Sequence, residues 1–166
     1  VAVIAGVVLA QAVLTFGARR ASAVLGYDVL AAAREETYAR PGALPEVVPS
    51  SIQKDISRRD FTVNAMAIRL PDLVFVDPFN GLEALANRVL DTPVTAEQSF
   101  DDDPLRIMRA ARFAAQLDFA VSEDVLAAMG AMAERLEIVS AERVRDEFIK
   151  LILSDNPRTG LELMVH

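Results

Sequence analysis

The stretch DDPLRIMRAARFAAQLDF, residues 102–119, decides the fold class of this chain because it joins a helix start to apolar residues at helical spacing. Asp103 precedes Pro104, and an acidic cap followed by proline at the first helical position is a common way to begin a helix. Small and apolar side chains recur along one side of the predicted helix and form a seam that another element can approach closely: Ile107, Ala110, Ala111 and Ala114.

Three arginines of this stretch, Arg106, Arg109 and Arg112, follow one another at intervals of three. On a helix each is rotated by roughly 60° from the one before, so they form a slowly turning basic stripe. Surface arginines on a helix are usually only solvated. Asp103, one turn before Arg106, could instead join it in offering an acceptor and a fork of donors to the edge of a flat base. The spacing by itself leaves both interpretations open.

The residues after Pro93 are predicted to be helical throughout. Residues 122–136 and 140–154 repeat the helical spacing of apolar positions, and each begins with a serine where a cap belongs. We place a domain boundary near residues 92–97, which divides the chain into residues 1–92 and residues 93–166.

The first half carries strand and turn signals, so the predicted fold class is α+β. Residues 63–78 predict a hairpin that turns at Pro71 and Asp72. Residues 40–51 contain three prolines and a glycine and are predicted to be an exposed connection. Residues 79–93 predict a turn, a short helix and a stop at proline.

The amino-terminal residues are mostly apolar. Residues 1–16 lack a basic leader and are shorter than the roughly 20 residues that span a bilayer, so we interpret them as a buried helix or strand and expect no membrane segment. A chain that starts on core-like residues suggests truncation, and an uncovered apolar run of this kind predicts self-association. Residues 27–33 have the apolar content of a buried strand, although their alanines also permit a helix.

The composition, with 52% hydrophobic and 25% charged residues over 166 positions, is that of a globular protein. The net charge of -7 gives no broad basic field, so any contact with nucleic acid must use a local basic patch. The chain has no cysteine, and His166 is its single histidine, which excludes disulfides and nearly excludes a zinc site. Cytoplasmic location is the default expectation.

The stretch DISRRDFTVNAMAIRL, residues 55–70, places Arg58, Arg59 and Asp60 directly before the apolar Phe61. An ordinary amphipathic element would distribute such charges around one face. A local ion pair at a helix start would account for Arg58 and Asp60. The alternative is that something fixed in the fold requires all three charges.

Four segments in order, RRDFTVNAMA, VDPFNGLEAL, DDPLRIMRAARFAAQLDF and AERVRDEFIKLIL, resemble the successive motifs of the family of class II tRNA nucleotidyltransferases, or CCA-adding enzymes, and bacterial poly(A) polymerases. The resemblance runs from about Asp55 to Val165. It implies the end of a nucleotidyltransferase head, made of a sheet with helices, followed by most of a helical neck. The implied activity of the parent enzyme is the addition of CMP and AMP from CTP and ATP to the 3' end of tRNA.

The same resemblance implies roles for individual residues. The neck motif Glu-Asp-x-x-Arg falls on Asp102, Asp103 and Arg106, with Asp102 in place of Glu, and its Asp and Arg would read the base edge of CTP or ATP. Glu142 and Arg143 match a later motif that stabilises the neck, with Ser140 as a helix cap. The implied nucleotide-binding residues are Arg59 at the triphosphate, Asp60 and Asn64 shaping the pocket, Asp103 and Arg106 at the base, and Arg109 and Arg112 lining the site.

Nucleotidyl transfer in this family uses Mg²⁺ ions held by an Asp-x-Asp pair, and no such pair precedes residue 55 in this chain. Asp28 lies where the family often has a third acidic residue and is the one candidate catalytic carboxylate. We therefore expect no complete metal site and no nucleotide addition by the chain as given. A poly(A) polymerase fragment and a non-catalytic RNA- or partner-binding helical module stay open as alternatives.

Overall fold

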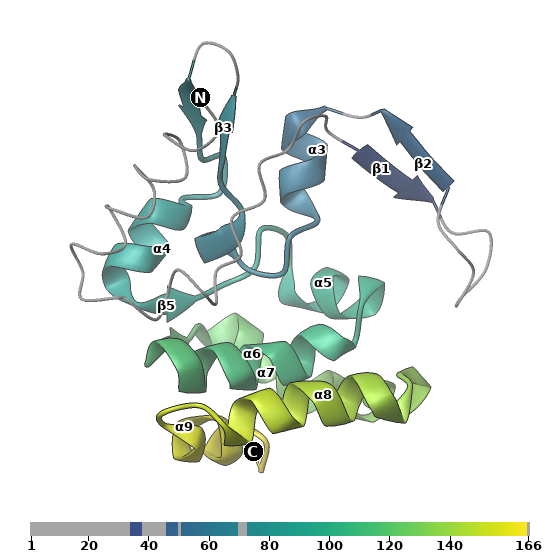
Figure 1. The fold of residues 1–166 in the computed structure, drawn as a ribbon, viewed down its shortest axis with the longest axis vertical. Coiled ribbons are helices and arrows are strands. Elements are labelled where there is room, and N and C mark those ends of the chain that lie inside the picture. Colours follow the sequence, from purple (N-terminus) through teal and green to yellow (C-terminus); the bar gives the residue numbers. More distant parts are fainter. Residues whose placement is uncertain (1–33, 38–45, 50, 70–72, 166) are drawn as a thin grey trace.

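The structure is a computed structural model that describes residues 34–37, 46–49, 51–69 and 73–165. The predictions for residues 1–16, residues 27–33 and Asp28, and for the turn at Pro71 and Asp72, lie outside the described residues. The described residues form small strand pairs and short helices in the first half and a layer of helices in the second (Figure 1). This arrangement is the predicted α+β class.

The predicted exposed connection at residues 40–51 was wrong in part, because it contains a strand. Strand β2 (Glu46–Pro49) pairs with strand β1 (Arg34–Thr37) in antiparallel register, with Arg34 opposite Pro49. The prolines suggested a loop, yet Pro49 lies at the end of β2, where the ladder tolerates proline. Two β-branched valines fill the centre of the strand and favour the extended backbone.

The predicted hairpin is confirmed by strands β3 (Ala67–Arg69) and β4 (Val74–Val76), which pair antiparallel. Two helical turns precede it in the chain: α3 (Ile52–Ser57), whose amino terminus is capped by the Ser51 side chain, and the 3₁₀ turn η1 (Thr62–Asn64). The residues Arg58 to Phe61 therefore connect two short helical turns.

The predicted short helix within residues 79–93 is α4 (Gly81–Asn87), which is followed by the two-residue strand β5 (Val89–Leu90). Asp77 caps the helix, since its two carboxylate oxygens accept from the backbone N–H groups of Gly81 at 2.7 Å and Leu82 at 3.0 Å. Carboxylates at a helix start satisfy donors that have no partner within the helix.

The second half is helical, as predicted, and contains two additional short helices, a 3₁₀ segment and a two-residue strand that pairs parallel with β5. These elements are too short for their apolar spacing to identify them in the sequence. In chain order the elements are α5 (Ala96–Asp102), α6 (Leu105–Leu117), β6 (Ala120–Val121), α7 (Glu123–Met132), η2 (Ala133–Ile138), α8 (Ala141–Ile152) and α9 (Pro157–Leu163).

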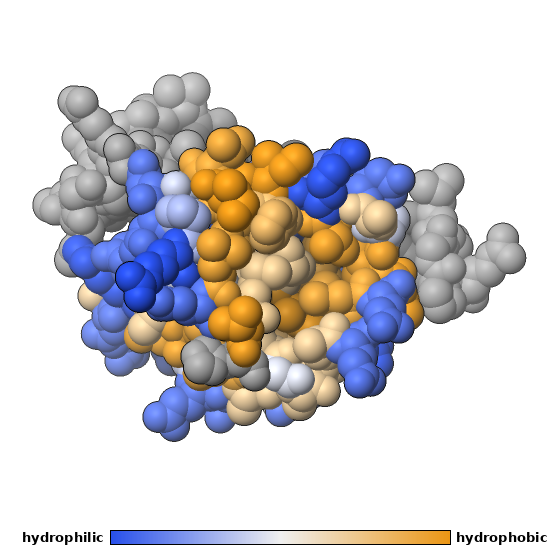
Figure 2. All heavy atoms as spheres, turned by 90° about the horizontal axis from the view of Figure 1, so that it is seen from below, coloured by the Kyte–Doolittle hydropathy of each residue, from blue (hydrophilic) through white to orange (hydrophobic). Residues whose placement is uncertain are grey.

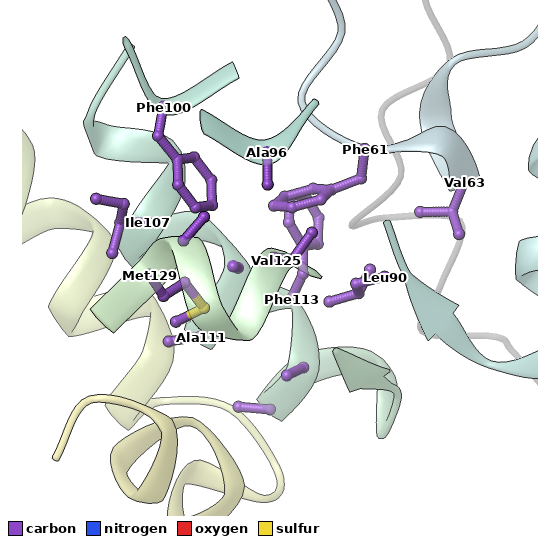
Figure 3. Packing of buried hydrophobic residues seen from close by; sticks show 14 of the residues in the cluster. Phe61, Val63, Leu90, Ala96, Phe100, Ile107, Ala111, Phe113, Val125 and Met129 are labelled. Atoms are coloured by element: carbon purple, nitrogen blue, oxygen red, sulfur yellow. The ribbon is translucent and has the colours of Figure 1, made fainter. Parts of the chain in front are cut away.

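One hydrophobic core joins the two halves (Figure 3). Phe61, from the segment before η1, is fully buried and packs edge-on against Phe113 of α6, with ring centroids 5.5 Å apart. Val63 of η1 and Leu90 of β5 belong to the same cluster. The segment of residues 58–64 is therefore anchored onto α6 by aromatic burial as well as by charge.

Helix α6 is the centre of the helical layer and packs against both α8 and α9. Of the small-residue seam predicted for it, Ala111 lies at the contact with α9, together with Ala115, which was not predicted. A Cβ added to Gly160 would lie 2.6 Å from the Ala111 carbonyl oxygen and 3.1 Å from the Ala115 Cβ. Only glycine permits so close an approach of the two backbones.

The face formed by α8 and α9 exposes apolar side chains, and Figure 2 shows it from below as a continuous apolar area bordered by charged residues. Patches of this kind are typical of surfaces on which another polypeptide packs. Its exposed residues are Phe148, Ile149, Ile152, Leu153, Leu161 and Met164. No helix in the described part of the chain is both long and apolar enough to cross a membrane.

Candidate functional site

The charged residues of the two motif segments meet where the connection before η1 crosses α6. The Asp60 carboxylate forms ion pairs with two arginines of α6. Its Oδ2 lies 2.6 Å from Arg109 Nη2, and its Oδ1 lies 3.4 Å from Arg106 Nε. The Asp60 side chain is 13% exposed. We call the site around Asp60, Arg106 and Arg109 the junction, because it joins the first half of the chain to the helical layer.

Arg106 is the most constrained side chain of the junction. Its Nη1 donates to the Ser99 carbonyl oxygen at 3.2 Å and to the Ser99 Oγ at 2.8 Å, and its Nη2 donates to the Arg58 carbonyl oxygen at 2.6 Å. The whole residue is 8% exposed. A guanidinium held from both sides by backbone carbonyls links the connection at Arg58 to helix α5.

The connection itself is held by local hydrogen bonds. The Asn64 Oδ1 accepts from the Phe61 backbone N–H at 3.2 Å, and the Thr62 N–H donates to the Asp91 carbonyl oxygen at 2.7 Å. Arg59 lies 3.7 Å from Asp55, one turn earlier in α3, and its side chain is 24% exposed. These contacts fix the backbone that presents Asp60.

Asp103 lies at the start of α6 and has two partners. Its Oδ1 accepts from the Leu105 N–H at 3.2 Å, which confirms the predicted cap, and its Oδ2 lies 3.1 Å from Arg143 Nη2 in α8. Arg143, predicted as a neck-stabilising residue, thus connects α8 to the cap of α6. Its neighbour Glu142 is exposed. The predicted cap at Ser140 was wrong, because Ser140 precedes α8 but its side chain accepts no hydrogen bond from the start of the helix.

Arg112 lies apart from the junction contacts, in a buried ion pair with Glu147 of α8. Its guanidinium also lies 4.0 Å from the centre of the Phe113 ring. Burial lowers the pKa of the Arg112 guanidinium, and the Glu147 charge offsets part of that effect. Burial would by itself raise the pKa of Glu147, but a hydrogen bond from Lys150 and the Arg112 charge outweigh it and hold that pKa below its ordinary value.

The junction carries a local excess of positive charge in an acidic chain. Within the junction the guanidinium groups of Arg106 and Arg109 face the single carboxylate of Asp60, which leaves one positive charge in excess. A basic site of this kind attracts a polyphosphate, and the fork of an arginine suits phosphate oxygens or a base edge.

The structure thus brings together some of the predicted residues and separates others. Asp60, Arg106 and Arg109 share one contact network, Asn64 and Arg59 support the same connection, Asp103 pairs with Arg143, and Arg112 pairs with Glu147. Whether each binds nucleotide stays a prediction. Ser99 was missed, because α5 and α6 are separate helices and no periodic spacing links Ser99 to Arg106.

Comparison with known proteins places these elements in a family. Residues 15–91 match the poly A polymerase head domain, and residues 118–166 match the probable RNA and SrmB-binding site of polymerase A. The CCA-adding enzyme of Streptococcus thermophilus is 42% identical over 142 residues, and that of Enterococcus faecalis is 38% identical over 138 residues. These alignments cover 84% and 81% of this chain and 35% and 33% of the relatives.

Solved structures of CCA-adding enzymes also match this chain in fold. The apo form II of a CCA-adding enzyme is 38% identical with a TM-score of 0.70, over 81% of this chain and 32% of that chain. The Bacillus stearothermophilus CCA-adding enzyme in complex with CTP gives a TM-score of 0.67 at 38% identity, over 71% of this chain and 30% of that one. The Thermotoga maritima CCA-adding enzyme complexed with tRNA gives 0.64 at 32% identity, over 82% and 36%.

The fold and the motifs match part of a poly(A) polymerase head domain followed by a helical region. The chain belongs to the family of CCA-adding enzymes and bacterial poly(A) polymerases. It spans about a third of the length of the curated relatives it matches.

Proposed function

We propose that this chain is the end of the head and most of the neck of a CCA-adding tRNA nucleotidyltransferase and that its junction binds CTP and ATP. The observation that carries this proposal is the convergence of the RRD segment and the DDPLR segment on one site with excess positive charge. The relatives named above are CCA-adding enzymes, and one of the matched structures is a complex with CTP. The tRNA 3' end is the proposed acceptor.

The proposed roles follow the predicted ones. Arg59 faces the triphosphate, Asp60 and Asn64 shape the pocket, and Asp103 with Arg106 reads the base. Arg109 lines the site beside Asp60, while Arg112, proposed as a further lining residue, holds α6 to α8 through Glu147. The proposed boundary between head and neck lies between residues 92 and 93.

Magnesium belongs to the proposal only as the cofactor of the parent enzyme. Bound Mg²⁺ would activate the attacking 3' hydroxyl and neutralise charge on the triphosphate. Among the described residues there is no group of three or more acidic, histidine or cysteine residues that could hold an ion, and Asp28 lies outside them. The described residues do not fit the ion, so the proposal concerns nucleotide recognition alone.

Calorimetric titration of the chain with CTP, ATP, UTP and GTP tests this function. CTP and ATP should bind at least about 10-fold tighter than UTP and GTP, because a correct base edge is worth roughly 1 to 3 kcal/mol. Asp103→Asn keeps the cap but replaces an acceptor oxygen by a donor, so it should reduce the preference without unfolding the protein. Asp146→Asn, on the exposed side of α8, is the matched control.

Equal affinity for all four nucleotides would contradict the proposed function. An unchanged preference in Asp103→Asn would leave Asp103 only as a helix cap. The same titration separates the poly(A)-adding alternative, for which ATP alone should be preferred. Binding of RNA by residues 118–166 is a weaker candidate, because this region has about twice as many acidic as basic side chains.

A further inference from the structure

We propose that Ser99 sets the base preference of the junction by fixing the guanidinium of Arg106, and is therefore a positioning residue for nucleotide selection. The inference rests on the function proposed above. Ser99 lies in α5, outside the motif residues assigned to the site, and is completely buried.

Both oxygen atoms of Ser99 accept from the same nitrogen. Arg106 Nη1 donates to the Ser99 Oγ at 2.8 Å and to the Ser99 carbonyl oxygen at 3.2 Å. The shorter contact is made by the side chain, so the hydroxyl supplies the better of the two bonds. Alanine or glycine at this position would retain only the carbonyl bond.

The other nitrogens of Arg106 show why this contact controls orientation. Nη2 donates to the Arg58 carbonyl oxygen at 2.6 Å, and Nε lies 3.4 Å from Asp60 without a hydrogen bond. The planar group is thus held at Nη1 by α5 and at Nη2 by the connection before η1. Anchors on two different nitrogens restrict rotation of the plane, and the anchor at Nη1 depends on the Ser99 hydroxyl for the shorter of its two bonds.

The number of donors left over determines which base can be accepted. A guanidinium has five N–H groups, and the two on Nη1 and one on Nη2 are committed to carbonyl and hydroxyl oxygens, which leaves two. The Nε N–H is buried beside Asp60, and the second N–H of Nη2 is a donor in a fixed direction. It suits the unprotonated ring nitrogen of cytosine or adenine and opposes the ring N–H of uracil or guanine.

Loss of the Ser99 hydroxyl should therefore relax selection more than it weakens binding. In Ser99→Ala the guanidinium keeps its charge, its bond to Arg58 and the longer bond to the backbone carbonyl oxygen of position 99, but it loses the shorter bond at Nη1 and can turn more easily to meet the carbonyl oxygens of uracil. We expect CTP affinity to stay within about 3-fold and the CTP-to-UTP preference to fall about 3- to 10-fold, the size of one net hydrogen bond.

The experiment measures dissociation constants for CTP and UTP with the full 166-residue chain, Ser99→Ala and a matched control. The control is Ser154→Ala, a half-buried serine at the end of α8 whose hydroxyl donates to the Leu151 carbonyl oxygen. The control should keep the wild-type preference. Ser99→Cys, with a similar volume and a weaker acceptor, should fall between Ser99→Ala and wild type, and it carries the test if Ser99→Ala does not fold.

A second measurement needs no nucleotide. The guanidinium N–H groups of Arg106 should exchange slowly with water in wild type and faster in Ser99→Ala, as followed by nitrogen-15 NMR. A wild-type chain without base preference would overturn the proposed function. A preference that persists in Ser99→Ala, or Arg106 exchange that stays slow there, would overturn the positioning role alone.

Discussion

Arg109 and Arg112 lie nearly one turn apart on α6, yet their surroundings differ. The Arg109 side chain is 30% exposed and meets Asp60 of the head, whereas the Arg112 side chain is 8% exposed and meets Glu147 of α8. Both are arginine–carboxylate pairs in the same basic stripe. The two pairs differ in how far the arginine side chain is exposed to water.

That difference divides the stripe into two ends. We call the Arg109–Asp60 pair the exchangeable end, because its arginine can change partner, and the Arg112–Glu147 pair the fixed end. A half-exposed arginine can exchange a carboxylate for a phosphate, because water lowers the cost of the change. A desolvated pair cannot separate without leaving a buried charge uncompensated. The residue type and the spacing are equal at both ends, so packing makes the end near Asp60 the one proposed to bind a ligand and the end near Glu147 a fixed structural contact.

The largest loss of stability is expected for Glu147→Ala, at the fixed end. Removing the carboxylate leaves Arg112 buried without its charge partner, so the free energy of unfolding should fall by about 3 to 5 kcal/mol in urea denaturation. Asp146→Ala, the adjacent residue in an exposed pair with Arg145, should lose less than about 1 kcal/mol. Equal losses in the two variants would show that burial does not separate these pairs.

Protonation of Glu147 breaks the same ion pair with Arg112 without a mutation, and its effect should be smaller than that of Glu147→Ala. The folded-state pKa of Glu147 lies below its ordinary value near 4.5, so its stabilisation is fully present above that pH. It is lost as the pH falls through the folded-state pKa. Unfolding followed from pH 7 to pH 3 should show a steeper acid loss in wild type than in Glu147→Gln, and parallel curves would contradict the shift.

The packing at the fixed end can be tested without changing a charge. Gly160→Ala places a methyl group against the Ala111 carbonyl oxygen and the Leu151 side chain, and should cost about 2 kcal/mol of unfolding free energy. The control Gly130→Ala, at an exposed position within α7, should instead stabilise by up to about 1 kcal/mol. A neutral Gly160→Ala would mean that α9 can move away from α6 at little cost.

At the exchangeable end, Asp60→Asn should cost about 1 to 2 kcal/mol, because Arg106 and Arg109 lose a charged acceptor while Arg106 keeps its oxygen acceptors at Ser99 and Arg58 and Arg109 keeps partial access to water. Thermal or urea unfolding measures the loss. Asp118→Asn, at an exposed left-handed position that asparagine tolerates, is the control. A cost as large as that of Glu147→Ala would remove the distinction between the two ends.

The smallest effect is expected for Arg143→Gln. Its pair with Asp103 is exposed, with the Arg143 side chain 55% accessible, and should contribute no more than about 0.5 kcal/mol. A double-mutant cycle with Asp103→Asn, at low and at high salt, measures the coupling between them. Coupling above about 1 kcal/mol that persists at high salt would contradict this expectation and show that the Arg143–Asp103 pair is a second fixed contact.

Much of the fold could be predicted because its signals are local. The cap at Asp103, the spacing along α6, the hairpin of β3 and β4, and the serine before α7 each depend on residues within a few positions of one another. Strands β1, β2, β5 and β6 were missed, since segments of two to four residues carry too little periodicity, whereas β3 and β4 were found by the turn signal between their two apolar runs.

The sequence by itself determined the helical layer, the arginine stripe and the family motifs. Only the tertiary structure decided which arginine meets which carboxylate, because those contacts are distant in the chain. Arg106 is 48 residues from its Arg58 acceptor, and Arg112 is 35 residues from Glu147. Arginines at equal spacing look alike along a sequence, and they become different only when packing removes water from one and leaves it at another.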